Sequence, residues 1–82
     1  MLLKLKLYSR SNCHLCEAME DELRPYIEAR DISVTRQLID NDKNLEALYG
    51  TKVPVLTLDE KILCHYFLDT EILLKAIAEH HN

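Results

Sequence analysis

Apolar and polar side chains alternate over residues 3–9, which is the periodicity of a β-strand with one buried face. The next segment, up to about Arg30, carries apolar residues at helical spacing. We expect Ser11 or Asn12 to cap this helix, because short polar side chains accept hydrogen bonds from its first turn. Pro25 lies inside the helical pattern, so we expect the helix to kink or to be interrupted there.

The remainder of the chain continues with further strand and helix patterns, separated by short polar turns. They predict a strand over residues 32–39, followed by a short helix around 45–49 that Asp40-Asn41-Asp42 precedes and Gly50 ends. After it, they predict a hairpin of strands over 53–58 and 62–67. A last helix, which Asp69 can cap, carries residues 72, 73, 76 and 77 on one side.

The resulting order, β-α-β-α-β-β-α, predicts an α/β fold. A strand–helix–strand unit crosses over with a right hand and pairs its two strands in parallel, whereas a hairpin adds antiparallel strands. We therefore expect a four-stranded mixed sheet flanked by three helices, whose helices cover both faces, in a single domain over residues 1–82.

Composition narrows the functional class. The net charge of −4 and the scattered basic residues argue against a nucleic-acid partner. The apolar runs are too short to span a membrane, and the N-terminus lacks the features of a signal peptide, so we expect a cytoplasmic monomer without membrane contact. In a reducing compartment, three cysteines indicate chemistry or metal binding in preference to structural disulfides.

The segment Cys13-His14-Leu15-Cys16 stands where the first predicted strand ends and the first helix begins. Unpaired N–H groups and the dipole at a helix N-terminus favour a thiolate at Cys13. Cys16 follows one helical turn later and shares a face with Cys13. We predict that Cys13 attacks a disulfide and that Cys16 resolves the mixed disulfide. Arg10 and a protonated His14 would add positive charge.

Two other interpretations of these cysteines stay open. Cysteine is often a buried, inert core residue. Zinc is the second alternative, but a structural zinc site needs four ligands and a C-x-x-C pair supplies two. No second ligand pair has the spacing of a zinc site, so we predict no metal. Single ligands are nevertheless available at Cys64, His14, His65, His80 and His81.

Two motifs, S-N-C-H-L-C before the first helix and T-K-V-P-V-L at the third strand, complete this pattern. With the order of elements, they resemble the short glutaredoxin-like proteins of the thioredoxin superfamily over nearly the whole chain. The resemblance implies a thiol–disulfide oxidoreductase or electron carrier of thioredoxin-like fold. It also implies that Pro54 lies beside the dithiol after a cis bond, although only about 5–6% of X–Pro bonds are cis. The backbone of Val53 would pair with a bound thiol substrate.

Members of that family carry a Gly-Gly pair where glutathione approaches the backbone. Counting from Pro54 puts Cys64-His65 at that position, where side chains would stand in the path of the ligand. We expect no bound cofactor, glutathione as a candidate redox partner, and thiols or disulfides of proteins or small molecules as substrates. The candidate substrate-binding residues are Arg10, His14, Val53, Pro54, Cys64 and His65.

Cys64 allows three hypotheses. It would be a second resolving cysteine, a third metal ligand, or a semi-buried strand residue without chemistry. For the whole chain, the alternative to catalysis is a thioredoxin-fold binding module whose dithiol senses redox state or holds a metal, because fold alone does not determine function.

Overall fold

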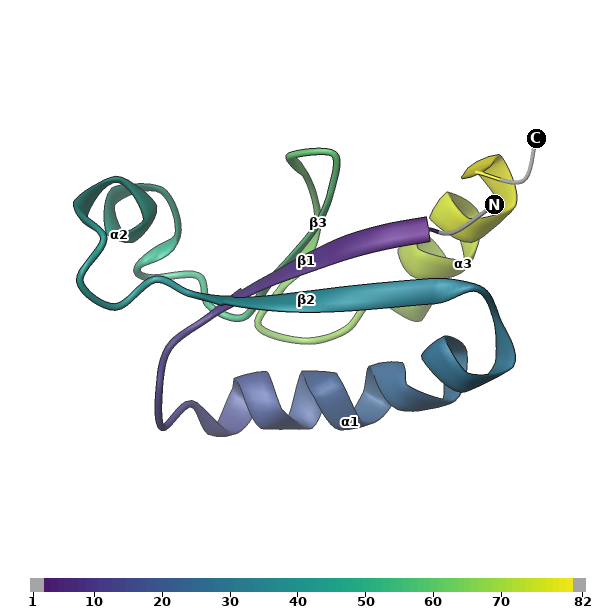
Figure 1. The fold of residues 1–82 in the computed structure, drawn as a ribbon, viewed down its shortest axis with the longest axis horizontal. Helices are drawn as coiled ribbons and strands as arrows, with labels where there is room; N and C mark the ends of the chain where they lie inside the picture. The colour runs from purple at the N-terminus through teal and green to yellow at the C-terminus, as the bar shows by residue number, and fades with distance from the viewer. Residues whose placement is uncertain (1–2, 81–82) are drawn as a thin grey trace.

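The computed structural model describes residues 3–80, and its elements follow the predicted order (Figure 1). None of its helices is long and apolar enough to cross a membrane. The elements are β1 (Leu3–Ser9), α1 (His14–Ala29), β2 (Ile32–Leu38), α2 (Lys43–Tyr49), β3 (Val55–Leu58), β4 (Lys61–His65) and α3 (Thr70–His80).

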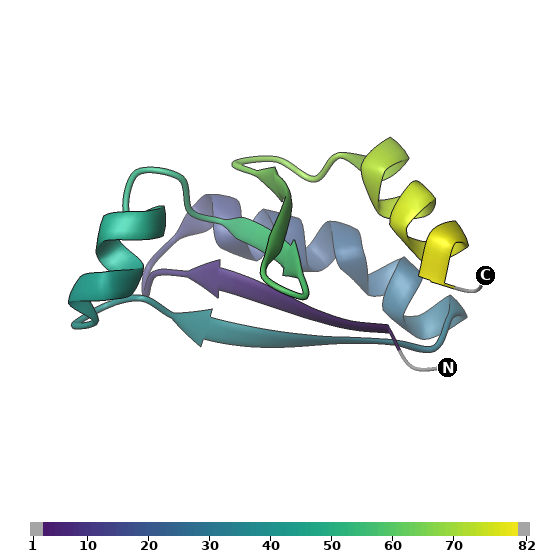
Figure 2. The same ribbon diagram turned by 90° about the horizontal axis from the view of Figure 1, so that it is seen from above.

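The four strands form one mixed sheet, as predicted, and their order in it is β2-β1-β3-β4. β1 and β2 are parallel, in a register that runs from Leu3 opposite Ile32 to Ser9 opposite Leu38. β3 is antiparallel to β1 and to β4. β1 is thus a central strand, and the parallel pair ends at one edge of the sheet, where the chain turns into α1 (Figure 2).

The main core lies on one face of the sheet, under α1 and α3. Alternation along β1 places Leu3, Leu5 and Leu7 on this face, and all three are buried. The helices and the other strands complete the core with Met19, Leu23, Ile32, Leu56, Cys64, Leu73 and Ile77.

A smaller cluster on the opposite face holds α2 against the sheet. Tyr49 of α2 stacks on Tyr8 of β1, with ring centroids 4.4 Å apart, and packs with Ile39 and Val55. Asp42 caps α2 by accepting a hydrogen bond from the Leu45 N–H at 3.0 Å, which confirms the predicted cap. The prediction that helices lie on both faces is confirmed, with α2 at one end of the second face (Figure 1).

Helix α1 differs from its prediction in two respects. Its N-cap is Cys13, whereas Ser11 and Asn12 precede it in a turn in which Asn12 has a φ of 58°. The predicted interruption at Pro25 is wrong, because the helix continues to Ala29. Proline removes one N–H from the ladder, and the buried residues Met19 and Leu23 hold the helix on the core regardless.

The hairpin strands are shorter than predicted. β3 begins at Val55, after Pro54, which has no N–H for a ladder hydrogen bond. β4 ends at His65, because the next residue, Tyr66, has a φ of 65° and leaves the extended conformation. The turn between them contains Asp59 and Glu60 only, both with positive φ, as the type I′ hairpin requires.

Gly50 ends α2 as predicted, but not through a left-handed conformation, because its φ is −53° and its ψ is −35°. A Cβ there would collide with the Glu46 carbonyl oxygen and lie 3.2 Å from an Arg10 guanidinium nitrogen. The position therefore requires glycine for close packing.

The packing of β1 generates a prediction about stability. Leu7 has an exposed fraction of 0%, so Leu7→Ala removes buried methyl groups and leaves a cavity. We expect the free energy of unfolding to fall by about 2–5 kcal/mol in urea titrations of the oxidised protein. Leu48→Ala is the matched control, because Leu48 is 60% exposed on α2; its expected change is within about 0.5 kcal/mol. Equal losses in the two variants would contradict this account of the core.

Candidate active site

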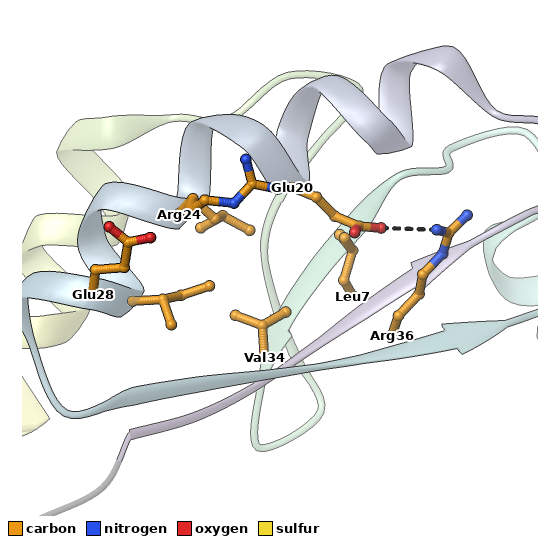
Figure 3. A pocket seen from close by; sticks show the side chains of 8 residues that line it. Leu7, Glu20, Arg24, Glu28, Val34 and Arg36 are labelled. Carbon is orange, nitrogen blue, oxygen red and sulfur yellow. Dashed lines mark ion pairs between the residues drawn. The ribbon is translucent and has the colours of Figure 1, made fainter.

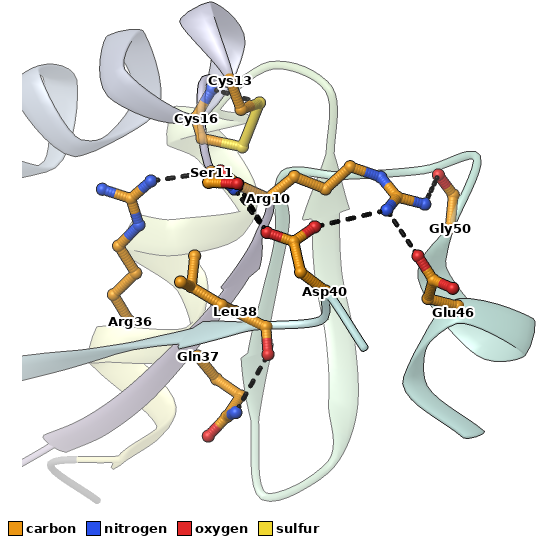
Figure 4. A network of polar contacts seen from close by, with 10 residues as sticks. All are labelled: Arg10, Ser11, Cys13, Cys16, Arg36, Gln37, Leu38, Asp40, Glu46 and Gly50. Atoms are coloured by element: carbon orange, nitrogen blue, oxygen red, sulfur yellow. Dashed lines mark hydrogen bonds and ion pairs between the residues drawn. A yellow bond between two sulfur atoms is a disulfide. The ribbon is translucent and has the colours of Figure 1, made fainter. Parts of the chain in front are cut away.

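The two cysteines of the C-x-x-C segment form a disulfide at the junction of β1 and α1 (Figure 4). Their Cα atoms are 5.2 Å apart. Cys13 is half-buried, whereas Cys16 has an exposed fraction of 0%. Only the first sulfur of the pair is therefore open to an incoming reactant.

The Cys13 sulfur occupies the N-cap position of α1. It accepts a hydrogen bond from the Cys16 backbone N–H, with a nitrogen–sulfur distance of 3.2 Å. A helix N-terminus stabilises an exposed negative charge by about 0.3–1 kcal/mol, and a hydrogen bond to a charged group contributes about 1.5–3 kcal/mol. The backbone N–H is thus the larger of the two contributions to a thiolate at this position.

His14 and Leu15 lie between the cysteines and face outward. The His14 side chain is 99% exposed, and its Nδ1 is 4.0 Å from a carboxylate oxygen of Glu17. Leu15 is 40% exposed. These two residues therefore form part of the surface next to Cys13.

The sequence predicts that Arg10 adds positive charge near Cys13. In the structure, the Arg10 guanidinium is hydrogen-bonded to other groups. It donates to Glu46 at 2.7 Å, to the Gly50 carbonyl at 3.1 Å and to Asp40 at 3.5 Å. The hydrogen bond to Glu46 is the main cause of a raised pKa for Arg10. Two carboxylates therefore balance the Arg10 charge, and the side chain extends towards α2 (Figure 4).

Asp40 anchors the loop that presents Cys13. Its Oδ2 accepts hydrogen bonds from the Ser11 backbone N–H at 2.9 Å and from the Ser11 hydroxyl at 2.7 Å. These bonds, the backbone one first, lower the pKa of the Asp40 carboxyl. From the sequence, Asp40 is expected only as part of a turn. Its contact with Ser11, 29 residues away, leaves no local pattern in the sequence.

Arg36 of β2 holds the same loop from its other side. Its Nε donates to the Ser9 hydroxyl at 2.8 Å, and its Nη2 donates to the Arg10 carbonyl at 3.2 Å. Arg36 also pairs with Glu20 of α1 at 3.1 Å. One side chain thus connects β2, the end of β1 and the first half of α1, a role that sequence reasoning missed.

The Glu20–Arg36 ion pair lies at a groove of about 280 Å³ between α1 and β2 (Figure 3). The groove is lined by four apolar residues and by four charged residues of both signs. They are Leu7, Leu23, Ile27 and Val34, with Glu20, Arg24, Glu28 and Arg36.

Val53 and Pro54 lie at the same edge of the sheet as the dithiol loop. The pairing of Val55 with Tyr8 brings Pro54 level with Ser9, and the Val53–Pro54 peptide bond is cis. Pro54 is buried and Val53 is partly buried. Within residues 3–80, the backbone N–H and C=O of Val53 form no backbone hydrogen bond. This leaves one backbone donor and one backbone acceptor of Val53 without a backbone partner in the described residues.

Cys64 and His65 differ in their surroundings. Cys64 is 8% exposed within the main core, where burial raises the pKa of its thiol. His65 is exposed, and its ring lies 4.8 Å from that of Tyr66. A bulge at Leu63 shifts the hairpin register, so that Cys64 faces Leu56. Counting from Pro54 could not anticipate this shift.

The candidate metal ligands do not assemble in the part of the chain that the structure describes. Over residues 3–80, no three side chains of histidine, cysteine, aspartate or glutamate lie close enough together to hold a metal ion. His81 and the side chain of His80 lie outside the described part.

Comparisons with known proteins agree with this geometry. Residues 4–78 match the family model described as "Glutaredoxin-like domain (DUF836)". Protein Ne2328 from Nitrosomonas europaea, solved by NMR, is 38% identical, with 93% of this chain and 92% of that chain covered and a TM-score of 0.84. An X-ray structure of protein XcR50 from X. campestris is 31% identical, with 92% and 96% covered and a TM-score of 0.69. No curated protein matched the chain.

The Asp40–Ser11 contact predicts a pH dependence of stability. Because the folded state lowers the pKa of Asp40, its contribution is complete above the pKa of the unfolded state, near 4, and is lost as pH falls through the folded value. We expect Asp40→Asn to unfold at a lower temperature than the wild type at pH 7 and to approach it at pH 2.5. Melting temperatures from pH 2.5 to 7 check this.

Asp31→Asn is the matched control, since it removes an aspartate from the turn before β2, outside this network. The prediction fails if Asp31→Asn and Asp40→Asn show the same difference from wild type across the pH range.

Proposed function

Since the chain belongs to the glutaredoxin-like domain family, we propose that it is a thiol–disulfide oxidoreductase that works through the Cys13–Cys16 dithiol. The observation that best supports this function is the difference between the environments of the two cysteines. Cys13 is accessible and accepts a backbone hydrogen bond at the N-terminus of α1, whereas Cys16 is fully buried one helical turn away. The first environment suits a nucleophile, and the second suits a resolving thiol.

The reaction begins with the reduced protein. The Cys13 thiolate attacks one sulfur of a substrate disulfide, forms a Cys13–substrate bond, and expels the other sulfur as a thiolate that takes up a proton. The Cys16 thiol then loses its proton and attacks the Cys13 sulfur. The second substrate thiol leaves, and the Cys13–Cys16 disulfide remains. Two electrons have passed from the protein to the substrate.

The hydrogen bond from the Cys16 N–H assists the first step. It is directed at the Cys13 sulfur, so it stabilises the thiolate before attack. Arg10 and Arg36 act differently, since their contacts orient the segment that carries Cys13. We assign them to positioning.

Substrates are thiols or disulfides of peptides, proteins or small molecules. The unpaired N–H and C=O of Val53, within residues 3–80, offer two backbone hydrogen bonds to a substrate chain beside the dithiol. Pro54 and the exposed His14 and His65 border this position in the proposal. Two molecules of glutathione, which leave as oxidised glutathione, or one dithiol donor of a reducing compartment such as the cytoplasm, regenerate the reduced form.

The division of labour between the cysteines predicts different products for two variants. Cys13→Ser should lose exchange with a peptide disulfide by at least about 10³-fold, because the nucleophile is gone. Cys16→Ser should still attack and should accumulate the mixed disulfide, because nothing resolves it. Mass spectrometry after alkylation distinguishes these states. If Cys13→Ser exchanges as fast as the wild type, or no glutathione buffer interconverts the dithiol and the disulfide, the proposed function is wrong.

The burial of Cys64 predicts that it takes no part in turnover. Its thiol lies in the core and its pKa is raised, so little thiolate is present at pH 7. We expect Cys64→Ala to keep the exchange rate within about twofold, and Cys64 to react with iodoacetamide more slowly than reduced Cys13. A Cys64→Ala variant that resolves mixed disulfides much more slowly would assign Cys64 a catalytic role.

A further inference from the structure

Tyr66 has a backbone conformation that aromatic residues rarely adopt. Its φ of 65° lies in the left-handed region, which glycine enters without steric cost. The other non-glycine residues with positive φ are asparagines or members of the β3–β4 turn, where this conformation is ordinary. The chain therefore retains a large ring at a position that favours glycine, which indicates a function for the ring.

Two hydrogen bonds hold Tyr66 along the segment that precedes β3. Its backbone N–H donates to the Pro54 carbonyl at 2.9 Å, and its hydroxyl donates to the Thr51 carbonyl. Because its backbone is bonded to Pro54 and its hydroxyl to Thr51, Tyr66 lies along the segment that contains Val53. Tyr66 is 40% exposed, so the residue forms part of the surface here.

The hydrogen-bond partners of Tyr66 lie on both sides of Val53 in the sequence. Val53 forms no backbone hydrogen bond within the part of the chain that the structure describes, and it lies at the sheet edge from which β1 leads to Cys13. We propose that Tyr66 is a specificity-determining residue, whose tethered ring restricts the pairing of a substrate peptide backbone with Val53. The proposal rests on the proposed function and refines its substrate class.

The physical consequence depends on the chemistry of the substrate. A peptide disulfide that pairs with Val53 must displace the ring and break the Tyr66–Thr51 hydrogen bond. A small organic disulfide without amide groups gains nothing from Val53 and leaves the ring in place. One net hydrogen bond corresponds to roughly a three- to tenfold change in an equilibrium constant. Tyr66 thus lowers the preference for peptide disulfides by about that factor.

The experiment compares two disulfides with the reduced protein and its variants. Oxidised glutathione carries amide groups, and bis(2-hydroxyethyl) disulfide carries none. In Tyr66→Gly and Tyr66→Phe, we expect kcat/KM for oxidised glutathione to rise about three- to tenfold. For bis(2-hydroxyethyl) disulfide we expect kcat/KM to stay within about twofold. Tyr66→Phe keeps the ring and loses the tether, so it decides the question if Tyr66→Gly fails to fold by circular dichroism.

Two control variants separate this effect from general ones. Glu60→Gly places glycine at a φ of 68° in the β3–β4 turn, away from Val53. Tyr26→Phe removes a phenol hydroxyl from α1. Both should keep the wild-type ratio of the two kcat/KM values.

An unchanged ratio in the Tyr66 variants overturns the proposal. A lower ratio overturns it too, because the ring would then help to bind the peptide. If the wild type reacts with neither disulfide, the proposed function itself fails; if it reacts with both and the ratio does not move, only the role of Tyr66 fails.

Discussion

The parallel pairing of β1 with β2 is the constraint on which the dithiol site depends. Parallel strands end at the same edge of a sheet, so the register from Leu3–Ile32 to Ser9–Leu38 brings the loop after β1 alongside the loop after β2. The Ile39 N–H continues the ladder by donating to the Ser9 carbonyl. Asp40 is then the next residue, within reach of Ser11, and the loop that carries Cys13 is fixed by its neighbour strand.

The arginine side chains at this edge are paired with carboxylates, so they add little positive charge near the cysteines. Arg10 is paired with Asp40 and Glu46, and Arg36 with Glu20. A thiolate at Cys13 therefore depends on the backbone of α1, through the Cys16 N–H, more than on a neighbouring cation. A backbone donor keeps its direction at any pH, whereas a surface ion pair is screened by salt. The rigid loop and the helix terminus act together, because the sulfur accepts that bond only if the loop places it at the N-cap.

Three cysteines occupy three environments in this small domain. Cys13 is half-buried at a helix terminus, Cys16 is buried directly beneath it, and Cys64 is buried in the core of the sheet. These environments favour a nucleophile, a resolving thiol and an inert thiol, in that order. The proposed chemistry thus belongs to the edge of the sheet that carries the dithiol. Tyr66 follows β4 and donates its backbone N–H to Pro54, which lies at the same edge.

Local patterns in the sequence determined the order of elements, the mixed sheet, the caps Asp42 and Asp69, and the position of the dithiol at a strand–helix junction. These features depend on periodicity and on contacts three residues apart, which a single sequence displays. Four features depend on the folded structure: the partners of Arg10, the anchoring role of Asp40, the burial of Cys64 and the hydrogen bond of the Tyr66 hydroxyl. Their contacts join residues 15 to 40 positions apart or depend on a bulge at Leu63. Strand register and side-chain packing decide such contacts, and neither leaves a local pattern in the sequence.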